Sequence, residues 1–406
     1  MSSRIKYVVV STSTCLTILL LIGSVLGKGA SSAEDTLKHI GVFSDVVAKI
    51  KTDYVEEPDM KSVTLGAVNG LLEAVDPFAS YLNADQYKEY LKNKDLKRGD
   101  VGLILSKKTG FVGVVDAQPN SPAAKAGLST WDMIESIKGI ATRDMPLAYA
   151  SLLLQGEPGS TVELSVVRMR RGDSQTVKLT RAMLTLPPVD SKMLAGQVGY
   201  INIDALSPAL VKEVAAAVQK LQRDGAQKLI VDVRYCAVGA PEDGVALAGL
   251  FLNKGMIGYV QGQTVRRQNF EADPSKVITT LPVAVLTNRG TASAAEVMAA
   301  ALLDNHRAQV VGERTYGDAA VRKAITMDDG SAIILSVAKY YAANGKAIQD
   351  TGVTPATQVA EPDIQVDYDE NGEPIPETQD AAQAPKKTED DPVVKKALEV
   401  LGVKAG

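Results

Sequence analysis

The apolar positions of the first hundred residues recur with a helical period. A first run lies on one helix face: Leu37, Ile40, Phe43, Val47 and Ile50. A second run extends from Val63 to Val75, and Pro77, which disfavours helix in the residue before it, follows. The pattern predicts an N-terminal helical segment over residues 34–96.

From residue 97 to residue 183 the helical period gives way to short runs rich in valine and isoleucine, with turn residues between them. Four runs have the length and composition of strands: Val101–Leu105, Phe111–Val115, Met133–Ile137 and Val162–Val167. Ser121, Pro122 and Gly127 have the spacing of an N-cap, a first helical residue and a C-cap. A small β-rich domain is expected here, with a second helix over Leu147–Leu154.

Between residues 184 and 360, strand-like runs alternate with amphipathic helix-like runs. Three strand candidates each precede a helix candidate: Val198–Ile203, Lys228–Val233 and Val283–Leu286. Such alternation is typical of a layered α/β domain. The whole chain is therefore expected to be a multidomain α/β and β protein.

The last part of the chain, residues 361–406, differs in composition. Between Glu361 and Asp391 there are eleven acidic residues against two lysines, with several prolines and few large apolar residues. This composition predicts an acidic flexible tail. A short terminal helix over Val393–Val403 is the one regular element expected in it.

Residues 1–33 have the pattern of an export signal. Arg4 and Lys6 precede an uncharged apolar run from Tyr7 to Leu26. The run suits either a cleaved signal peptide or a membrane anchor, and both place the rest of the chain outside the cytoplasm. Cys15 lies in that run, so Cys236 is the single cysteine of the exported part, which is therefore expected to form no internal disulfide.

Composition narrows the range of functions. With 44 basic and 48 acidic side chains the net charge is -4, so nucleic acid is not an expected partner. No cluster has the spacing of a zinc site or a phosphate-binding loop, and no metal or other cofactor is expected. Cys236 with His39 or His306 would make a thiol–imidazole pair, but neither histidine lies in a site-like loop, and a structural thiol is the preferred interpretation.

Several motifs, in order, resemble those of the C-terminal processing peptidases, or tail-specific proteases. They are Asp53-Tyr54-Val55, Asp76-Pro77-Phe78-Ala79-Ser80-Tyr81, Asn120 to Leu128, Leu229 to Arg234, Gly290 to Val297 (GTASAAEV), Val311 to Gly317, and Gly345 to Gln349 followed by Thr351 to Pro355. The resemblance implies an exported serine endopeptidase with the tail-specific protease fold. It identifies residues 97–183 as a PDZ domain and residues 184–360 as the protease-like core.

The resemblance also implies that the PDZ domain captures the C-termini of proteins. An extended peptide would add to a strand edge, with its carboxylate held by backbone N–H groups. The candidate peptide-binding residues are Val101, Gly102, Leu103, Ile104, Ala150 and Leu154. The alternative is that the apolar members of this set are core residues of a small β domain.

By position, the family's nucleophile falls on Ser293, because Glu296 aligns with the glutamate of the family motif. A second interpretation is open, since Ser293-Ala294-Ala295-Glu296 also has the spacing of an S-x-x-E capping box at a helix start. We favour the cap, because the rest of the catalytic set departs from the family pattern.

The family cuts with a serine and a lysine, assisted by a glutamine four residues after the lysine. Here Asp318 stands at the lysine position and Arg322 at the glutamine position. An aspartate with a pKa near 3.9 is a weak base at neutral pH, and an arginine does not lose its proton. The two are expected to form an ion pair within the former site. Lys323 would replace the base only if a bulge turned it to the same face.

The candidate oxyanion residues are Val238, Gly239 and Ala294. Relatives usually have proline and glycine where this chain has Ala237 and Val238, and a β-branched residue tolerates a positive φ badly. Loss of one oxyanion donor costs roughly 100- to 1000-fold in rate. Activity is therefore expected to be absent or strongly impaired.

Three hypotheses follow. The favoured one is a degenerate family member that binds protein C-termini without cutting them. The second is an active endopeptidase with Ser293 as nucleophile and Lys323 or a residue from another segment as base. The third is a dimerising scaffold, with a homodimer as the partner. In each, an uncleaved N-terminal segment would also bind the membrane.

Overall fold

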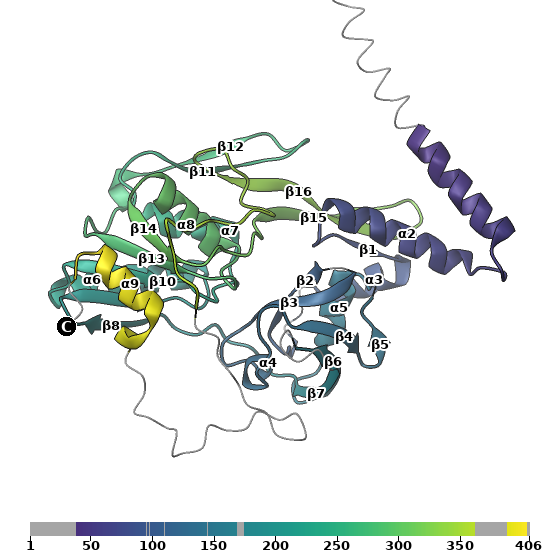
Figure 1. Cartoon of the computed structure of the whole chain (residues 1–406), viewed down its shortest axis with the longest axis horizontal. Coiled ribbons are helices and arrows are strands. Elements are labelled where there is room, and N and C mark those ends of the chain that lie inside the picture. The colour runs from purple at the N-terminus through teal and green to yellow at the C-terminus, as the bar shows by residue number, and fades with distance from the viewer. Residues whose placement is uncertain are drawn as a thin grey trace, which may run out of the picture. The chain divides into compact units, whose positions relative to one another are not determined.

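The computed structural model describes residues 38–94, 96, 98–108, 110–143, 145–168, 174–361 and 388–403. The chain divides into two compact units, one ending at Ala67 and one beginning at Val68. In the first unit residues 38–53 are helical, and helix α2 (Met60–Val75) begins there, so the expected helices are confirmed (Figure 1). Within the described ranges, no helix is long and apolar enough to cross a membrane. The predicted export signal, residues 1–33, lies outside them.

One part of the predicted helical segment is a strand. After α2 the chain turns at Asp76 and Pro77 and forms β1 (Ser80–Leu82), followed by α3 (Ala84–Asn93). β1 pairs antiparallel with the start of β16 (Ala332–Ala342). A three-residue strand has little pattern of its own, and its partner lies about 250 residues further along the chain. The purely helical expectation for residues 34–96 is therefore wrong at β1.

The β-rich region forms one antiparallel sheet with the strand order β2-β3-β4-β6-β7, and β5 pairs with β4. Its strands are β2 (Leu103–Lys108), β3 (Phe111–Ala117), β4 (Met133–Ile137), β5 (Ile140–Ala141), β6 (Thr161–Val167) and β7 (Ser174–Thr180). The short helix α4 (Pro122–Lys125) begins as predicted, with the Ser121 hydroxyl accepting the Ala124 N–H at 3.1 Å. Helix α5 (Leu147–Leu154) closes the core of this sheet.

The third region is a mainly parallel sheet with the order β17-β14-β13-β10-β9-β8, in which only β8 is antiparallel to its neighbour. Its strands are β8 (Asp190–Leu194), β9 (Val198–Asn202), β10 (Lys228–Asp232), β13 (Val283–Thr287), β14 (Ala308–Gly312) and β17 (Thr357–Gln358). The connecting helices are α6 (Pro208–Arg223), α7 (Pro241–Gly249) and α8 (Ala294–Asp304). The predicted alternation of strands and helices is confirmed.

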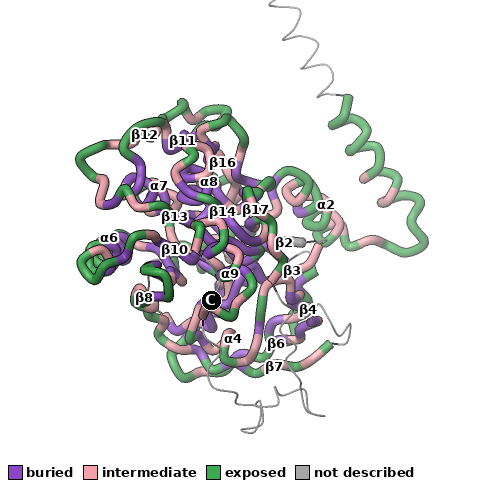
Figure 2. The backbone as a smooth tube through the Cα atoms, turned by 60° about the vertical axis from the view of Figure 1, so that its left-hand side comes forward, coloured by how far each residue is buried: buried purple, intermediate pink, exposed green. Residues whose placement is uncertain are grey.

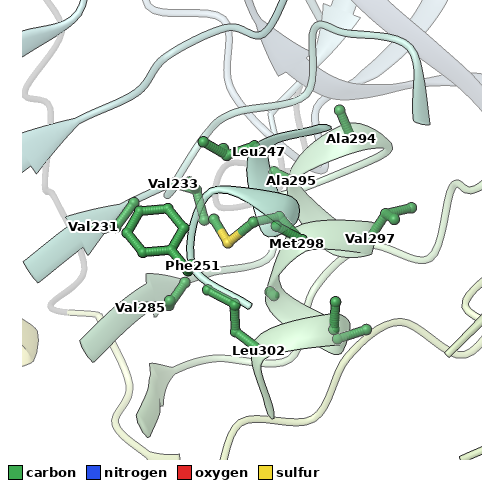
Figure 3. Close-up of a cluster of buried hydrophobic side chains, with 14 of the residues drawn as sticks. Val231, Val233, Leu247, Phe251, Val285, Ala294, Ala295, Val297, Met298 and Leu302 are labelled. Carbon is green, nitrogen blue, oxygen red and sulfur yellow. The ribbon is translucent and has the colours of Figure 1, made fainter. Parts of the chain in front are cut away.

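Both faces of this sheet are covered, because successive strand residues point to opposite sides. Val231 packs with α7 and α8, as the cluster around Phe251 and Met298 shows (Figure 3). Ile230 faces the other side, where it packs against the terminal helix α9 (Pro392–Val400). Strand β13 is buried along its whole length, in keeping with a parallel strand covered on both faces (Figure 2).

Helix α9 confirms the short terminal helix expected over Val393–Val403, and its burial corrects the prediction of a flexible tail for this stretch, while residues 362–387 lie outside the described ranges. Four of its residues are buried against the sheet: Val393, Val394, Ala397 and Leu398. Burial of such side chains contributes about 1.5–3 kcal/mol for each of the larger ones, so this helix belongs to the core. Composition could not predict this burial, because the sheet face that α9 covers is formed by residues far along the chain.

A further sheet, with the order β1-β16-β11-β12 and with β15 on β16, lies beside α8. Its remaining strands are β11 (Met256–Gln261), β12 (Gln268–Glu271) and β15 (Ala320–Thr326). Short 3₁₀ turns occur at Pro274–Lys276 and Thr388–Asp390. Strand β15 carries Arg322, and the turn before it carries Asp318, so this sheet supports the candidate site.

Candidate functional site

Ser293 lies in the turn between strand β13 and helix α8, in an unusual backbone conformation. Its φ is 54° and its ψ is -117°, a combination that side-chain-bearing residues rarely adopt. The half-buried hydroxyl donates a hydrogen bond to the carbonyl oxygen of Gly239 at 2.9 Å. The serine proton thus faces a backbone carbonyl, which is an acceptor but not a general base.

The hydroxyl does not cap helix α8. The Ser293 side chain makes no hydrogen bond to the first turn of α8, and the Glu296 N–H bonds instead to the Ser293 backbone carbonyl at 3.1 Å. Only the other half of the expected capping box forms, with the Glu296 carboxylate accepting the Ser293 N–H at 3.1 Å. The predicted capping box is therefore confirmed for the Glu296 carboxylate, and Ser293 is the N-cap residue of α8, but the hydroxyl forms no bond as a cap. Its strained turn directs the side chain toward the loop that contains Gly239.

The Glu296 carboxylate joins the serine turn to the segment that carries Asp318. It is fully buried, and it accepts hydrogen bonds from the Thr315 hydroxyl, the Gly317 N–H (2.7 Å) and the Asp318 N–H (2.8 Å), besides that of Ser293. Burial raises the pKa of Glu296 to about 7, and these donors act against the rise. Since the backbone nitrogens of residues 293 and 318 both contact Oε2, the structure brings the two predicted site residues together.

Asp318 and Arg322 form the ion pair that the sequence predicted. The guanidinium donates to Asp318 Oδ1 and lies 4.1 Å from the centre of the Phe78 ring. Burial raises the pKa of the Asp318 carboxyl, and the charge of Arg322 opposes that rise. Both side chains are mostly covered, with 14% and 27% of their surface exposed. The two residues that the resemblance assigns to the family's lysine and glutamine positions are thus paired with each other.

Lys323 does not take the place of a buried amine. It is exposed in β15, next to Arg322. The pairing of β15 with β16 contains an irregularity, but there Val321 and Arg322 face Ala338 and Ser336, so the extra residue belongs to β16. The alternation of side chains along β15 is therefore kept, and the condition under which Lys323 would serve as the base is not met.

The candidate oxyanion loop presents a carbonyl to the serine. Gly239 has φ 140°, and a Cβ on it would lie 2.8 Å from the Cβ of Leu206. Val238 is not at positive φ, and its carbonyl accepts the Leu206 N–H at 2.7 Å. Ala294 is buried at the start of α8. With the Gly239 carbonyl directed at Ser293, negative charge beside this oxygen would be repelled rather than stabilised.

Sequence reasoning missed a set of contacts centred on Arg234, which follows β10. Its guanidinium binds Asp232 (2.7 Å), Glu361 (3.0 Å) and Asp391 (2.8 Å), and it is largely buried. Asp391 also accepts the N–H groups of Val393 and Val394 as the N-cap of α9. The sequence feature that could have pointed to Asp391 is the proline that follows it, since aspartate followed by proline is typical of the start of a helix.

Glu361 connects Arg234 to the turn that contains Ser293, because it also binds Asn288. Its Oε2 accepts hydrogen bonds from Tyr235 (2.6 Å) and Asn288 (2.9 Å). The Asn288 side-chain oxygen in turn accepts the N–H groups of Tyr235 and Gly290, both at 3.0 Å. The loops on either side of Ser293 are therefore joined to the C-terminal segment.

The candidate peptide-binding residues divide into two groups. Val101, Ala150 and Leu154 are buried in the core of the β-rich domain, which agrees with the alternative that they are core residues. Leu103 and Ile104 are half-buried in β2, which is an edge strand of its sheet. Gly102 has φ 82°, and its N–H bonds to the Asp100 carboxylate at 2.8 Å. The edge near Leu103 is the part of this set placed for strand addition.

The far end of the β2 edge is already used within the chain. The Lys107 N–H bonds to the Pro77 carbonyl at 3.0 Å, and Phe78 packs into the core of the β-rich domain. Ser106 and Tyr316 share a hydrogen bond between their hydroxyls. Val115 packs with Ala237 and Ala292 of the α/β core. These contacts place the edge strand next to the segments that form the candidate site.

Groups of histidine, cysteine and acidic residues suited to a metal ion do not occur in the part of the chain that the structure describes. Cys236 is fully buried there, and burial raises the pKa of its thiol. A buried neutral thiol is unreactive, in keeping with its structural interpretation.

Comparison with known proteins agrees with this architecture. The pattern of the PDZ domain matches residues 113–168, and that of peptidase family S41 matches residues 197–359. The carboxy-terminal processing protease CtpA of Bacillus subtilis is 30% identical over 366 residues, which are 89% of this chain and 78% of the relative. The carboxyl-terminal-processing protease of Picosynechococcus sp. is 33% identical over 299 residues, or 72% of this chain and 71% of the relative.

A solved structure has the same fold. The photosystem II D1 C-terminal processing protease superimposes with a TM-score of 0.65 at 28% identity, over 77% of this chain and 85% of that chain. The two domain matches, the superposition and the sequence identities all point to the same family. The chain belongs to the carboxy-terminal processing proteases of peptidase family S41.

Proposed function

We propose that this chain is a catalytically degenerate carboxy-terminal processing protease, which binds the C-termini of other proteins through its PDZ domain without cutting them. The observation that carries the proposal is the ion pair of Asp318 and Arg322 at the positions assigned to the family's lysine and glutamine. A serine attacks only when a neighbouring base takes its proton. The guanidinium of Arg322 binds Asp318 Oδ1 and opposes the rise that burial gives the pKa of this carboxyl, which makes the carboxylate a weaker proton acceptor than an uncharged amine.

The hydroxyl of Ser293 supports the same proposal. Its proton is directed to the Gly239 carbonyl, and Lys323 is exposed on β15. A productive site needs N–H donors where this carbonyl lies. This arrangement supports the proposal, because acyl transfer requires both a proton acceptor and an oxyanion site beside the serine.

Binding of C-termini is supported by the retained parts of the PDZ domain. Strand β2 lies at the edge of its sheet, with Leu103 half-exposed. An edge strand recognises an extended peptide through main-chain hydrogen bonds. The relatives act, by name, on carboxy-terminal regions, and we extend that class of ligand to this chain.

Export is part of the proposal. Arg4, Lys6 and the apolar run that follows support a location outside the cytoplasm, either free or tethered. The homodimer stays a prediction.

A second candidate is an active endopeptidase, and one observation favours it. The strained turn at Ser293, with φ 54° before a helix, is the kind of conformation that holds serine nucleophiles exposed at the start of a helix. In that case a rearrangement of the Gly239 carbonyl and a base from another segment would both be needed.

One experiment separates the two. The full chain, its Ser293→Ala variant and the double variant Asp318→Lys with Arg322→Gln are incubated with an unfolded protein that has an apolar C-terminus. We expect the unaltered chain to bind this protein without cleavage, and to lose binding when the substrate's C-terminus is amidated. The double variant, which restores the amine and the amide, would test whether the ion pair alone blocks the chemistry.

Cleavage by the unaltered chain that disappears in Ser293→Ala would overturn the proposal. Cleavage that persists in Ser293→Ala would point to a contaminating protease. Binding that ignores amidation would contradict capture through the C-terminus.

A further inference from the structure

Trp131 is held in a strained backbone conformation where the β-rich domain meets the α/β core. Its φ is 78°, a value that a bulky residue rarely adopts. The surrounding turn enforces it, since the Trp131 N–H bonds to Val114 and the Asp132 carboxylate accepts the Ser129 N–H at 3.0 Å. Asp132 is itself fixed by a buried ion pair with Arg168 at 3.0 Å. Strain kept at such a position is typical of functional sites.

The Trp131 ring forms one wall of a pocket of about 300 Å³. It lies 6.1 Å from the ring of Tyr316, centre to centre, at an angle of 39°. The other lining residues come from the α/β core: Arg289, Glu313, Arg314 and Thr315. We name this site the Trp131 pocket. Its volume lies at the lower end of the range found for ligand pockets, and suits one or two amino-acid side chains.

The charge of the Trp131 pocket is positive. Arg289 and Glu313 neutralise each other through two hydrogen bonds, at 2.8 and 3.1 Å. Arg314 is exposed, and within the described residues it has no ion pair or hydrogen bond. A guanidinium beside two aromatic rings binds a carboxylate with the attached methylenes lying on the rings.

The Trp131 pocket is also joined to both of the sites already described. The Tyr316 N–H bonds to the carbonyl of Thr291, two residues before Ser293, and the Tyr316 hydroxyl bonds to Ser106 of β2. Tyr316 thus connects the pocket to strand β2, along whose edge the captured peptide is proposed to bind.

We propose that the Trp131 pocket binds an acidic side chain of the protein whose C-terminus the PDZ domain captures, with its carboxylate on Arg314 and its methylenes on Trp131 and Tyr316. The inference rests on the proposed function and adds a preference for acidic residues to it. Amidated peptides keep the two tests apart, because they lack the terminal carboxylate that the PDZ domain is proposed to hold.

Trp131 is the single tryptophan of the chain, so its fluorescence reports on the pocket directly. The full chain is titrated with the N-acetylated, C-terminally amidated peptide Ala-Glu-Phe-Glu-Ala, and with the same peptide carrying glutamine in place of glutamate. We expect a saturable fluorescence change with the glutamate peptide and at least tenfold weaker binding of the glutamine peptide. Raising the salt concentration should weaken the first interaction and not the second.

Arg314→Gln should abolish the difference between the two peptides, whereas Arg266→Gln, at an exposed arginine of the loop between β11 and β12, should preserve it. Equal binding of both peptides, no fluorescence change with either, or an unaltered preference in Arg314→Gln would overturn the proposal. The same two peptides with a free C-terminus are titrated as well, and if only these bind, with no preference for glutamate, the carboxylate recognised is the C-terminal one. That result would support the PDZ proposal and refute the acidic-side-chain site.

Discussion

At the scale of single residues, the chemistry of the site depends on which groups surround Ser293. One face presents the Gly239 carbonyl, and the segment joined to it through Glu296 presents Asp318 with Arg322. Arg322 does more than neutralise an acid, because it also stacks on Phe78 beside the β-rich domain. Arg322 thus connects Asp318 to a residue that packs into the core of the β-rich domain, and we infer a structural role for the ion pair.

Removal of Arg322 tests that role. Arg322→Ala leaves the Asp318 carboxylate largely buried without its cation and takes the guanidinium off Phe78. We expect a loss of about 1–3 kcal/mol in the free energy of unfolding, measured by urea denaturation. Lys323→Ala, one position along the same strand and exposed, should change it by less than about 0.5 kcal/mol. Equal effects in the two variants would show that the pair adds nothing to stability.

At the scale of elements, the helices and strands with strong periodicity were predictable and the long-range contacts were not. The alternation in residues 184–360 reflects strands buried between helices, so β9, β10 and β13 could be placed from pattern alone. Strand β1 and the docking of α9 depend on partners far along the chain, about which local composition says nothing. The pairing of Asp318 with Arg322 was predictable because the two residues are only four positions apart, while Arg234 binds acids from three separate segments.

The Arg234 contacts make α9 a support for the loop that contains Cys236 and Gly239. In a Cys15→Ser background, Cys236 is the single thiol, and its reaction with a thiol reagent under native conditions measures opening of this loop. Asp391→Ser keeps an N-cap for α9 but loses the contact to Arg234, so we expect roughly tenfold faster labelling. Asp390→Asn, at an exposed neighbour paired with Lys395, should label at the original rate. Unchanged labelling in Asp391→Ser would show that α9 does not hold the loop.

At the scale of the whole molecule, the β-rich domain and the α/β core share a boundary that contains a buried acid. Asp116 follows Val115, which packs on Ala237 and Ala292, and its Oδ2 is buried without a hydrogen-bond partner in the described chain. Burial, with a smaller contribution from Asp204 of the core, raises the pKa of Asp116 from its ordinary 3.8 to about 8. Asp116 is therefore expected to stay protonated below about pH 8 where the two domains pack against each other.

This arrangement predicts how stability depends on pH. Between about pH 3.8 and pH 8 folded Asp116 keeps a proton that the unfolded chain has released, so the free energy of unfolding falls as the pH rises, by about 1.4 kcal/mol per unit at most. Glu296, with its pKa raised to about 7, contributes in the same direction. Asp116→Asn removes the Asp116 contribution because the amide stays neutral. In urea denaturation at pH 5 and pH 8, the variant should lose less stability between the two values and should be the more stable protein at pH 8. Parallel pH profiles for the two proteins would show that Asp116 is ionised within the fold, and that the boundary tolerates its charge.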